Sequence, residues 1–333
     1  MPNPDLTLLR AAVTSPFRKA GRPGAVLPTG RSVLPPAPIA PGPLAAYRRI
    51  CGFPDAATLP LTYPHVRGFP LAMRLMTARG FPLPVVGLVH TWIEITRHRP
   101  PLTTDLLELT VYADGLSPHR RGTEVTVVTE ARRAGELIWE SRSGYLSRHA
   151  PNPGPTSNSH HTPNPRPAER DTPPAADGTV TDRTAADRTA APATEGTPDA
   201  RIADTSGEAP DTTAAGAADG PPAVDEWRLP GDLGRRYGAA SGDRNPIHLY
   251  PLTARLFGFP RPIAHGMWTV ARCLAEAPDP EGIQRVRAVF RAPVPLPSTV
   301  AHAADANGFR LYGADGRVHL IGTTTRAPGP RTA

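Results

Sequence analysis

The feature that most constrains the fold of this chain is a long internal stretch that cannot build a hydrophobic core. Residues 151–224 contain no aromatic residue, no Leu, no Met and only three large aliphatic residues. Such a segment buries too little apolar surface to offset the conformational entropy lost on ordering. We therefore predict a disordered low-complexity linker over 151–224, between folded parts at 1–150 and 225–333.

Charge follows the same division. The predicted linker holds five arginines and eleven acidic residues, a net charge of −6. The whole chain has a net charge of +7, so the residues outside the linker carry +13. The arginines outside the linker are scattered, without a basic run or an aromatic-interleaved patch, and this argues against nucleic-acid binding. A small phosphate-bearing partner needs only a few arginines.

The N-terminal part predicts helices first and strands afterwards. A Pro-rich lead-in occupies about residues 1–43, and it precedes helical patterns at 44–51 and 70–78. Pro70 would lie in the first turn of the second helix, and Gly80 would be its C-cap. Partly alternating β-branched and aromatic runs then predict strands, with turn residues between them that indicate an antiparallel meander, at 85–96, 106–113, 124–131 and 137–146.

The C-terminal part repeats this order. Helices are predicted at 231–240, 251–257 and 265–276, and strands at 285–291, 299–304, 310–312 and 318–324. The third helix is apolar around most of its circumference, which is typical of a buried helix. Two successive units of helix and then meander predict a duplicated α+β fold, with a curved sheet around the buried helix.

Polar residues that could take part in acid–base chemistry lie together on one short loop after residue 241. Gly242 can end the preceding helix in a left-handed conformation, and Pro246 forces Asn245 to be extended. Asp243, Asn245 and His248 are therefore expected on a stiff loop, not on one face of a helix. From spacing alone, an ordinary turn Asp with an unrelated His remains an open alternative.

The surrounding residues favour a functional Asp–His pair over an ordinary turn Asp with an unrelated His. The segment SGDRNPIH, followed by GFPRPIAHGM, resembles the hydratase 2 motif of the MaoC-like dehydratases. The resemblance implies that Asp243 and His248 are the catalytic pair and that Asn245 belongs to the active-site network. It also implies that the backbone N–H of Gly266 forms the oxyanion hole.

Three further segments, LTYPHVRGFPLAMRLM, FPLPVVGLVH and VFRAPVPLPSTV, resemble the two-hotdog acyl dehydratases of actinobacteria. The implied fold is an α+β double hotdog, with a motif-free N-terminal hotdog and a catalytic C-terminal one, either monomeric or a homodimer. The long linker departs from this pattern, although long insertions between folded units cost little. Phe69, Met73 and Met76 are candidates to line an acyl channel, and an ordinary core role is equally open for each.

The implied activity is reversible hydration of trans-2-enoyl thioesters, or dehydration of (3R)-3-hydroxyacyl thioesters, carried on coenzyme A or acyl carrier protein. Such a hydro-lyase needs no cofactor and no metal. Ser241 and His265 are predicted as supporting residues. Ser241 is not expected to be a nucleophile, because no nucleophile-elbow pattern surrounds it. Which of Asp243 and His248 is the base remains open.

Two other functions are possible for a hotdog protein. A hotdog thioesterase usually places its carboxylate on the hotdog helix, whereas Asp243 precedes the helix here. A non-catalytic acyl-binding subunit would not need both Asp243 and His248. His65 and His90 are isolated from any Asp in sequence and are predicted to pack or form turns.

The remaining features point to a cytoplasmic protein. Cys51 and Cys273 are too few and too far apart for a disulfide framework. The N-terminus lacks a continuous apolar segment, and no apolar run approaches the ~20 residues that cross a bilayer. Trp268 is predicted to be a core residue.

Overall fold

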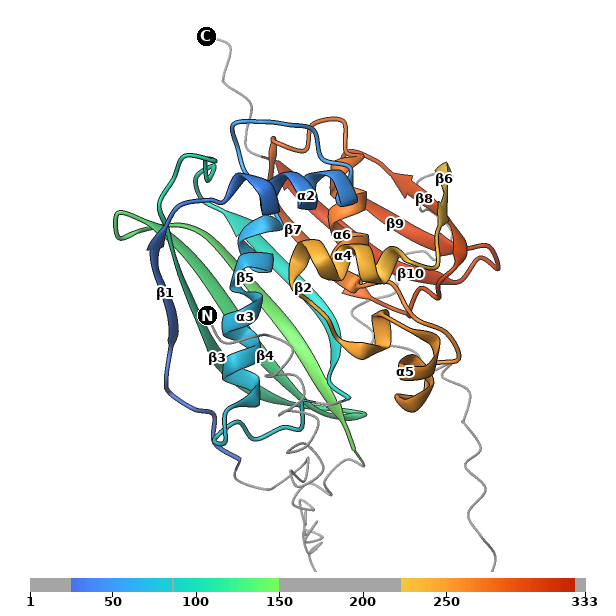
Figure 1. The fold of residues 1–333 in the computed structure, drawn as a ribbon, viewed down its shortest axis with the longest axis horizontal. Coiled ribbons are helices and arrows are strands. Elements are labelled where there is room, and N and C mark those ends of the chain that lie inside the picture. The colour runs from blue at the N-terminus through green and yellow to red at the C-terminus, as the bar shows by residue number, and fades with distance from the viewer. Residues whose placement is uncertain (1–24, 86, 150–222, 327–333) are drawn as a thin grey trace, which may run out of the picture. The chain divides into compact units, whose positions relative to one another are not determined.

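The fold is built on one ten-stranded antiparallel sheet, with the strand order β1-β3-β4-β5-β2-β7-β10-β9-β8-β6 (Figure 1). The computed structural model describes residues 25–85, 87–149 and 223–326. The N-terminal part supplies β1 (Ser32–Ala37), β2 (Val89–Arg97), β3 (Leu107–His119), β4 (Gly122–Arg133) and β5 (Glu136–Arg148). The C-terminal part supplies β6 (Ala223–Leu229), β7 (Ile283–Phe290), β8 (Ser298–Ala304), β9 (Gly308–Gly313) and β10 (Val318–Arg326).

The two halves join where β2 pairs with β7. Their register places Ile93 opposite Ala288, and both side chains are fully buried. On the other face of the same strands, the Glu94 carboxylate pairs with Arg285 at 2.8 Å and Arg287 at 3.4 Å. Because side chains alternate along a strand, the seam has one apolar face and one charged face.

Each half wraps its part of the sheet around one helix. The helices are α2 (Pro41–Cys51), α3 (Tyr63–Thr77), α4 (Leu233–Ser241), α5 (Pro251–Leu256) and α6 (Gly266–Ala275), with a 3-10 turn, η2 (Pro246–His248). α3 packs against β3 and β4, and α6 packs against β9 and β10 (Figure 1). Both halves thus have the predicted hotdog arrangement.

The helices of the two halves also contact each other, because α2 packs on α4 and α6. The indole N–H of Trp268 on α6 donates to the carbonyl of Ile50 on α2 at 2.9 Å. The rings of Tyr47 and Tyr237 lie with centroids 6.1 Å apart. Trp268 is 4% exposed, so its predicted core role is confirmed.

The second N-terminal helix was predicted too short. α3 begins at Tyr63, Pro64 occupies its first turn, and Pro70 lies inside it. Its C-cap is Ala78 in an extended conformation, so Gly80 does not cap it. An internal proline removes one helical hydrogen bond at a cost of about 3 kcal/mol. Burial of ten of the fifteen residues of α3 offsets that cost.

Three strand features also differ from prediction. β3 continues to His119 through residues expected to form a turn, because its pairing with β4 extends to Gly122. β1 lies within the predicted lead-in and contains Pro35 and Pro36, which an edge strand tolerates. β6, the strand at the other edge of the sheet, begins at Ala223 inside the stretch predicted as linker.

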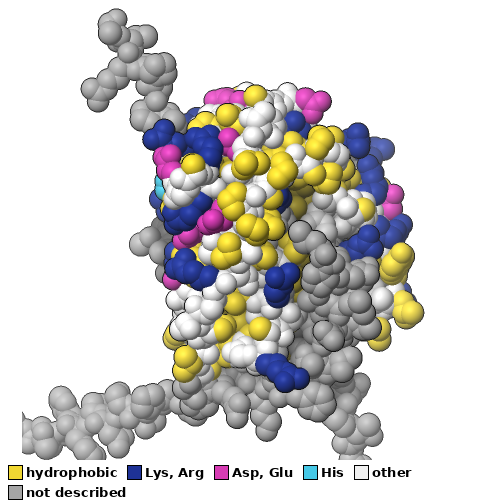
Figure 2. All heavy atoms as spheres, turned by 60° about the vertical axis from the view of Figure 1, so that its left-hand side comes forward, with side chains coloured by type: hydrophobic (Ala, Val, Ile, Leu, Met, Phe, Trp, Pro, Cys, Tyr) yellow, Lys and Arg dark blue, Asp and Glu magenta, His cyan; other side chains and the backbone are white. Residues whose placement is uncertain are grey.

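The described residues all fall in one compact unit, whereas almost all of the predicted linker lies outside the described residues. Within that unit Cys51 and Cys273 are buried free thiols. No helix among the described ranges has the length and apolar character needed to span a membrane. Figure 2 shows arginines scattered over one face with hydrophobic surface between them, in keeping with the absence of a basic run.

Candidate active site

The end of α4 aims the chain into the site. Gly242 is the C-cap, with φ 78° and its N–H bonded to the Gly238 carbonyl. A left-handed residue ends the helix at once, as the sequence predicted. The next N–H, that of Asp243, donates to Ser241 Oγ at 3.2 Å. Ser241 therefore helps to hold the start of the loop.

The loop is held by two successive side-chain-to-backbone hydrogen bonds. Asp243 Oδ1 accepts the N–H of Asn245 at 3.1 Å, and Asn245 Oδ1 accepts the N–H of Ile247 at 3.4 Å. Asn245 has ψ 125°, the extended conformation expected before proline. The prediction missed that Pro246–His248 forms a 3-10 turn, which Asn245 caps.

His248 has its tautomer set by a backbone group. Its Nδ1–H donates to the Ile263 carbonyl at 2.7 Å. A carbonyl can only accept, so the proton must lie on Nδ1, and Nε2 keeps its lone pair. The ring stacks on that of His265, with centroids 3.7 Å apart. His248 therefore presents a positioned base nitrogen.

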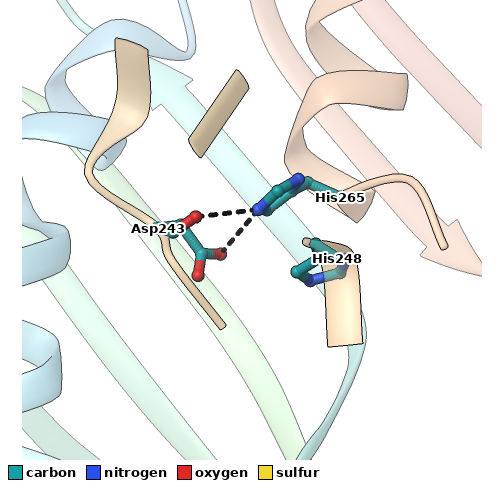
Figure 3. A group of neighbouring side chains, drawn as sticks. All are labelled: Asp243, His248 and His265. Atoms are coloured by element: carbon teal, nitrogen blue, oxygen red, sulfur yellow. Dashed lines mark hydrogen bonds and ion pairs between the residues drawn. The ribbon is translucent and has the colours of Figure 1, made fainter. Parts of the chain in front are cut away.

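His265 joins the loop to the buried helix. It is the N-cap residue of α6, and its Nε2–H donates to the Asp243 carbonyl at 2.9 Å, with Asp243 Oδ2 at 3.9 Å. Figure 3 shows both interactions and the way Asp243, His248 and His265 converge from separate segments. The role of His265 beside the catalytic pair remains a prediction.

Gly266 directly follows His265 and is the first residue of α6. The first N–H groups of a helix have no intrahelical acceptor, and the helix dipole makes that end positive. A Cβ at this position would lie 2.8–3.1 Å from ring carbons of Phe290. Only glycine fits there without moving the Phe290 ring.

Burial and mutual charge act in opposite directions on these groups. Burial raises the pKa of Asp243 above its ordinary value, while His248 lowers it. Burial lowers the pKa of His248, while the Asp243 carboxylate raises it. Burial and then His248 hold the pKa of His265 well below its ordinary value. Both imidazoles are therefore neutral at neutral pH.

The same three residues are potential metal ligands. One atom each of Asp243, His248 and His265 lie within 4.8 Å of one another. Zinc accepts such a set of nitrogen and carboxylate ligands. A bound ion would compete with the hydrogen bonds that His248 Nδ1 and His265 Nε2 already make.

The N-terminal half, which lacks the motif, also contributes residues close to this group, and the sequence did not predict their proximity. Tyr145 of β5 stacks on His90 of β2 at 4.6 Å, and His90 lies 4.8 Å from Phe290, measured between ring centroids. Phe290 covers Gly266, and the charge of Asp243 adds to burial in raising the pKa of Tyr145. Only the pairing of β2 with β7 could have revealed this proximity.

The other predicted residues of the N-terminal half lie in packed positions. His65 bonds through Nδ1 to Ser141 Oγ at 3.0 Å, so the packing roles of His65 and His90 are confirmed. Met73 and Met76 belong to the hydrophobic core, and Phe69 packs against it. A lining role for these three remains a prediction.

Fold and site together define a class: a double-hotdog protein with an Asp–His loop beside the N-terminus of its second buried helix. The family model described as "MaoC like domain" matches residues 218–322. The 3-hydroxyacyl-thioester dehydratase X of Mycobacterium tuberculosis is 31% identical over 285 residues, which cover 85% of this chain and 82% of the relative. The chain belongs to the MaoC-like dehydratase family.

Solved structures agree with this assignment. A crystal structure of HtdX from Mycobacterium tuberculosis matches with a TM-score of 0.64 and 28% identity, covering 90% of this chain and 100% of the other. A MaoC-like dehydratase from Phytophthora capsici matches with a TM-score of 0.63 at 14% identity, covering 93% and 99% of the two chains. The second match shows the shared fold alone.

Proposed function

We propose that this protein is a hydro-lyase that interconverts trans-2-enoyl thioesters and (3R)-3-hydroxyacyl thioesters. The observation that carries the proposal is the Asp243–His248 pair beside the N-terminus of α6. The name of the similar dehydratase from Mycobacterium tuberculosis supports the same reaction class. The 3R configuration rests on the family resemblance.

The pair has the dimensions to hold one water molecule. A carboxylate oxygen of Asp243 and a ring nitrogen of His248 lie within 4.8 Å of each other. One water can make hydrogen bonds of about 2.8 Å to both atoms at that separation. Two acceptors on one water direct its oxygen lone pair toward the substrate.

The hydrogen bonds of His248 favour it as the base. Because Nδ1–H is bonded to the Ile263 carbonyl, Nε2 is the nitrogen that can take a proton. In hydration, the water gives its proton to Nε2 and its hydroxyl to Cβ. The imidazolium then returns that proton to Cα. The Asp243 carboxylate orients the water and stabilises the transient imidazolium.

Negative charge develops meanwhile on the thioester oxygen. The Gly266 N–H, at the positive end of α6, is the proposed donor to that oxygen. Loss of one such donor typically costs about a hundredfold or more in rate. The fit of Phe290 against Gly266 holds this end of the helix in place.

The site favours this reaction over the alternatives. α6 has the sequence GMWTVARCLA and contains no carboxylate, whereas a hotdog thioesterase usually carries one on that helix. A binding-only subunit would not need Asp243 and His248 on a loop that five hydrogen bonds hold in place. We further propose a cytoplasmic enzyme in which the two hotdogs of one chain replace a homodimer.

The test is an assay on a chain-length series of trans-2-enoyl-CoA thioesters, with loss of the conjugated absorbance and release of free thiol followed together. Absorbance loss without thiol release supports the hydro-lyase and ranks the substrates. Stoichiometric thiol release would replace it with a thioesterase.

A further inference from the structure

Exposed hydrophobic side chains concentrate on α5 and its flanks. Tyr250, Leu252, Leu256 and Phe257 are 53%, 72%, 76% and 36% exposed. Among the described residues, only three other large hydrophobic side chains are comparably exposed, and they lie elsewhere in the chain. We call these four side chains the α5 patch. Clustered exposed apolar side chains typically mark a docking surface.

The α5 patch adjoins the catalytic loop. α5 begins three residues after His248, and Thr253 Oγ1 donates to the Pro246 carbonyl at 2.7 Å. Downstream of α5, the N–H of Ile263 donates to the Ile247 carbonyl at 3.2 Å. A six-residue helix is only about 9 Å long, so a partner bound to the patch lies at the edge of the catalytic loop.

Three arginines lie close to the α5 patch in the sequence or in space. Arg235 lies over the Tyr250 ring at 5.3 Å, and Arg255 and Arg261 are exposed. The sequence from residue 244 to residue 275 contains no Asp and no Glu. An occupant therefore has to supply both apolar side chains and negative charge.

We propose that the α5 patch docks an acidic carrier protein that delivers the acyl group as a thioester. The proposal rests on the proposed function, because the thioester must enter the site beside the patch. Charge complementarity brings the carrier to the arginines, and apolar side chains of the carrier cover the four hydrophobic ones.

Other occupants fit less well. The segment 151–224 has the right charge, −6, but only three large aliphatic residues with which to cover the patch. A second copy of this chain would place arginine against arginine around a shared axis. An anionic membrane would match the charge but would not present a tethered thioester to the loop.

The experiment compares one acyl group on two carriers in the full chain. Trans-2-octenoyl groups are supplied on coenzyme A and on an acidic acyl carrier protein, and KM and kcat are measured for each. The variants are Leu252→Ser with Leu256→Ser, and Arg255→Glu with Arg261→Glu. The control is Leu106→Ser, an exposed leucine of the other half, 56% exposed.

Each α5 variant is expected to raise KM for the carrier-bound substrate about tenfold or more, since hydrophobic anchors and paired charges of an interface contribute on this scale. The expected kcat, and both constants on coenzyme A, stay within about twofold of wild type. Salt should raise KM for the carrier-bound substrate alone.

Equal losses on both substrates would assign α5 to the catalytic loop and overturn the proposal, as would unchanged KM on the carrier. A changed molecular mass in solution would reassign the patch to self-association, and loss of binding to anionic vesicles would reassign it to a membrane. If wild type turns over neither substrate, the proposed function fails. In that case, fluorescence anisotropy with the labelled carrier measures docking independently of turnover. Patch variants that bind the carrier as well as wild type would refute docking on the α5 patch.

Discussion

At the scale of single residues, the proposed chemistry depends on two groups, and burial disfavours the charged form of each. The Asp243 carboxylate becomes harder to ionise, and the His248 imidazole becomes harder to protonate. The sequence predicted the members of this group and their loop. It did not predict the tautomer of His248, which depends on the carbonyl of Ile263, fifteen residues away.

The pH dependence of kcat/KM follows from these shifts. Both groups act deprotonated in the proposed hydration, so activity is lost as pH falls. His248 has a pKa below its ordinary 6.5 and Asp243 has one above its ordinary 3.8. We expect an acid limb set by whichever of the two groups has the higher pKa, with a plateau above it, measured as kcat/KM on an enoyl thioester.

The Asp243→Asn variant provides the matched control for the acid limb. Removing the carboxylate removes the charge that raises the pKa of His248, so the limb of the residual activity should move to lower pH. A limb that stays at the same pH in Asp243→Asn would contradict His248 as the base.

Gly266 makes a second prediction at this scale. In Gly266→Ala the new Cβ meets the Phe290 ring at 2.8 Å, so the start of α6 or the ring must move. We expect kcat to fall about a hundredfold, and Gly266→Ala with Phe290→Leu to recover part of the loss. Full activity in Gly266→Ala would mean that the Phe290 ring moves and α6 does not, which would contradict the expectation that Phe290 holds the start of α6 in place.

At the scale of elements, most of the fold could be predicted from local pattern. The hydrophobic periodicity located both buried helices and eight of the ten strands. The two edge strands were not predicted, because β1 contains prolines and β6 adjoins low-complexity sequence, so neither has a strand pattern. The proximity of Tyr145 and His90 to the candidate site was not predicted, because it depends on sheet pairing between residues far apart in sequence.

The close packing of α4 on the catalytic turn can be tested through Gly234. A Cβ there would lie 1.9 Å from the His248 carbonyl oxygen, so Gly234→Ala must displace the turn. Since a displacement of about 1 Å can cost a hundredfold in rate, we expect a loss of that order in kcat. Gly231→Ala is the control, because its Cβ meets only Pro297 at an ordinary 3.6 Å. Equal activity of the two variants would contradict a catalytic turn held by α4.

At the scale of the whole molecule, the two hotdogs share one sheet and a packed set of helices. The pairing of β2 with β7 and the Trp268–Ile50 hydrogen bond both link the halves. We therefore expect one cooperative unfolding transition in urea. Trp92 and Trp139 report on the N-terminal half, and Trp227 and Trp268 on the C-terminal half. Within each Trp→Phe variant that retains only one pair, tryptophan fluorescence and far-UV circular dichroism should give coincident midpoints. Separate midpoints would mean that the halves fold independently.

The central claim is that Asp243 and His248 add water across the Cα–Cβ bond of a thioester. The most direct measurement is mass spectrometry of the product formed from trans-2-octenoyl-CoA in H₂¹⁸O. The account predicts ¹⁸O at C3 of an intact hydroxyacyl thioester, and a rate lower by about a hundredfold or more in His248→Gln, where the base is lost. Appearance of ¹⁸O in a free carboxylate, or an unchanged rate in that variant, would contradict it.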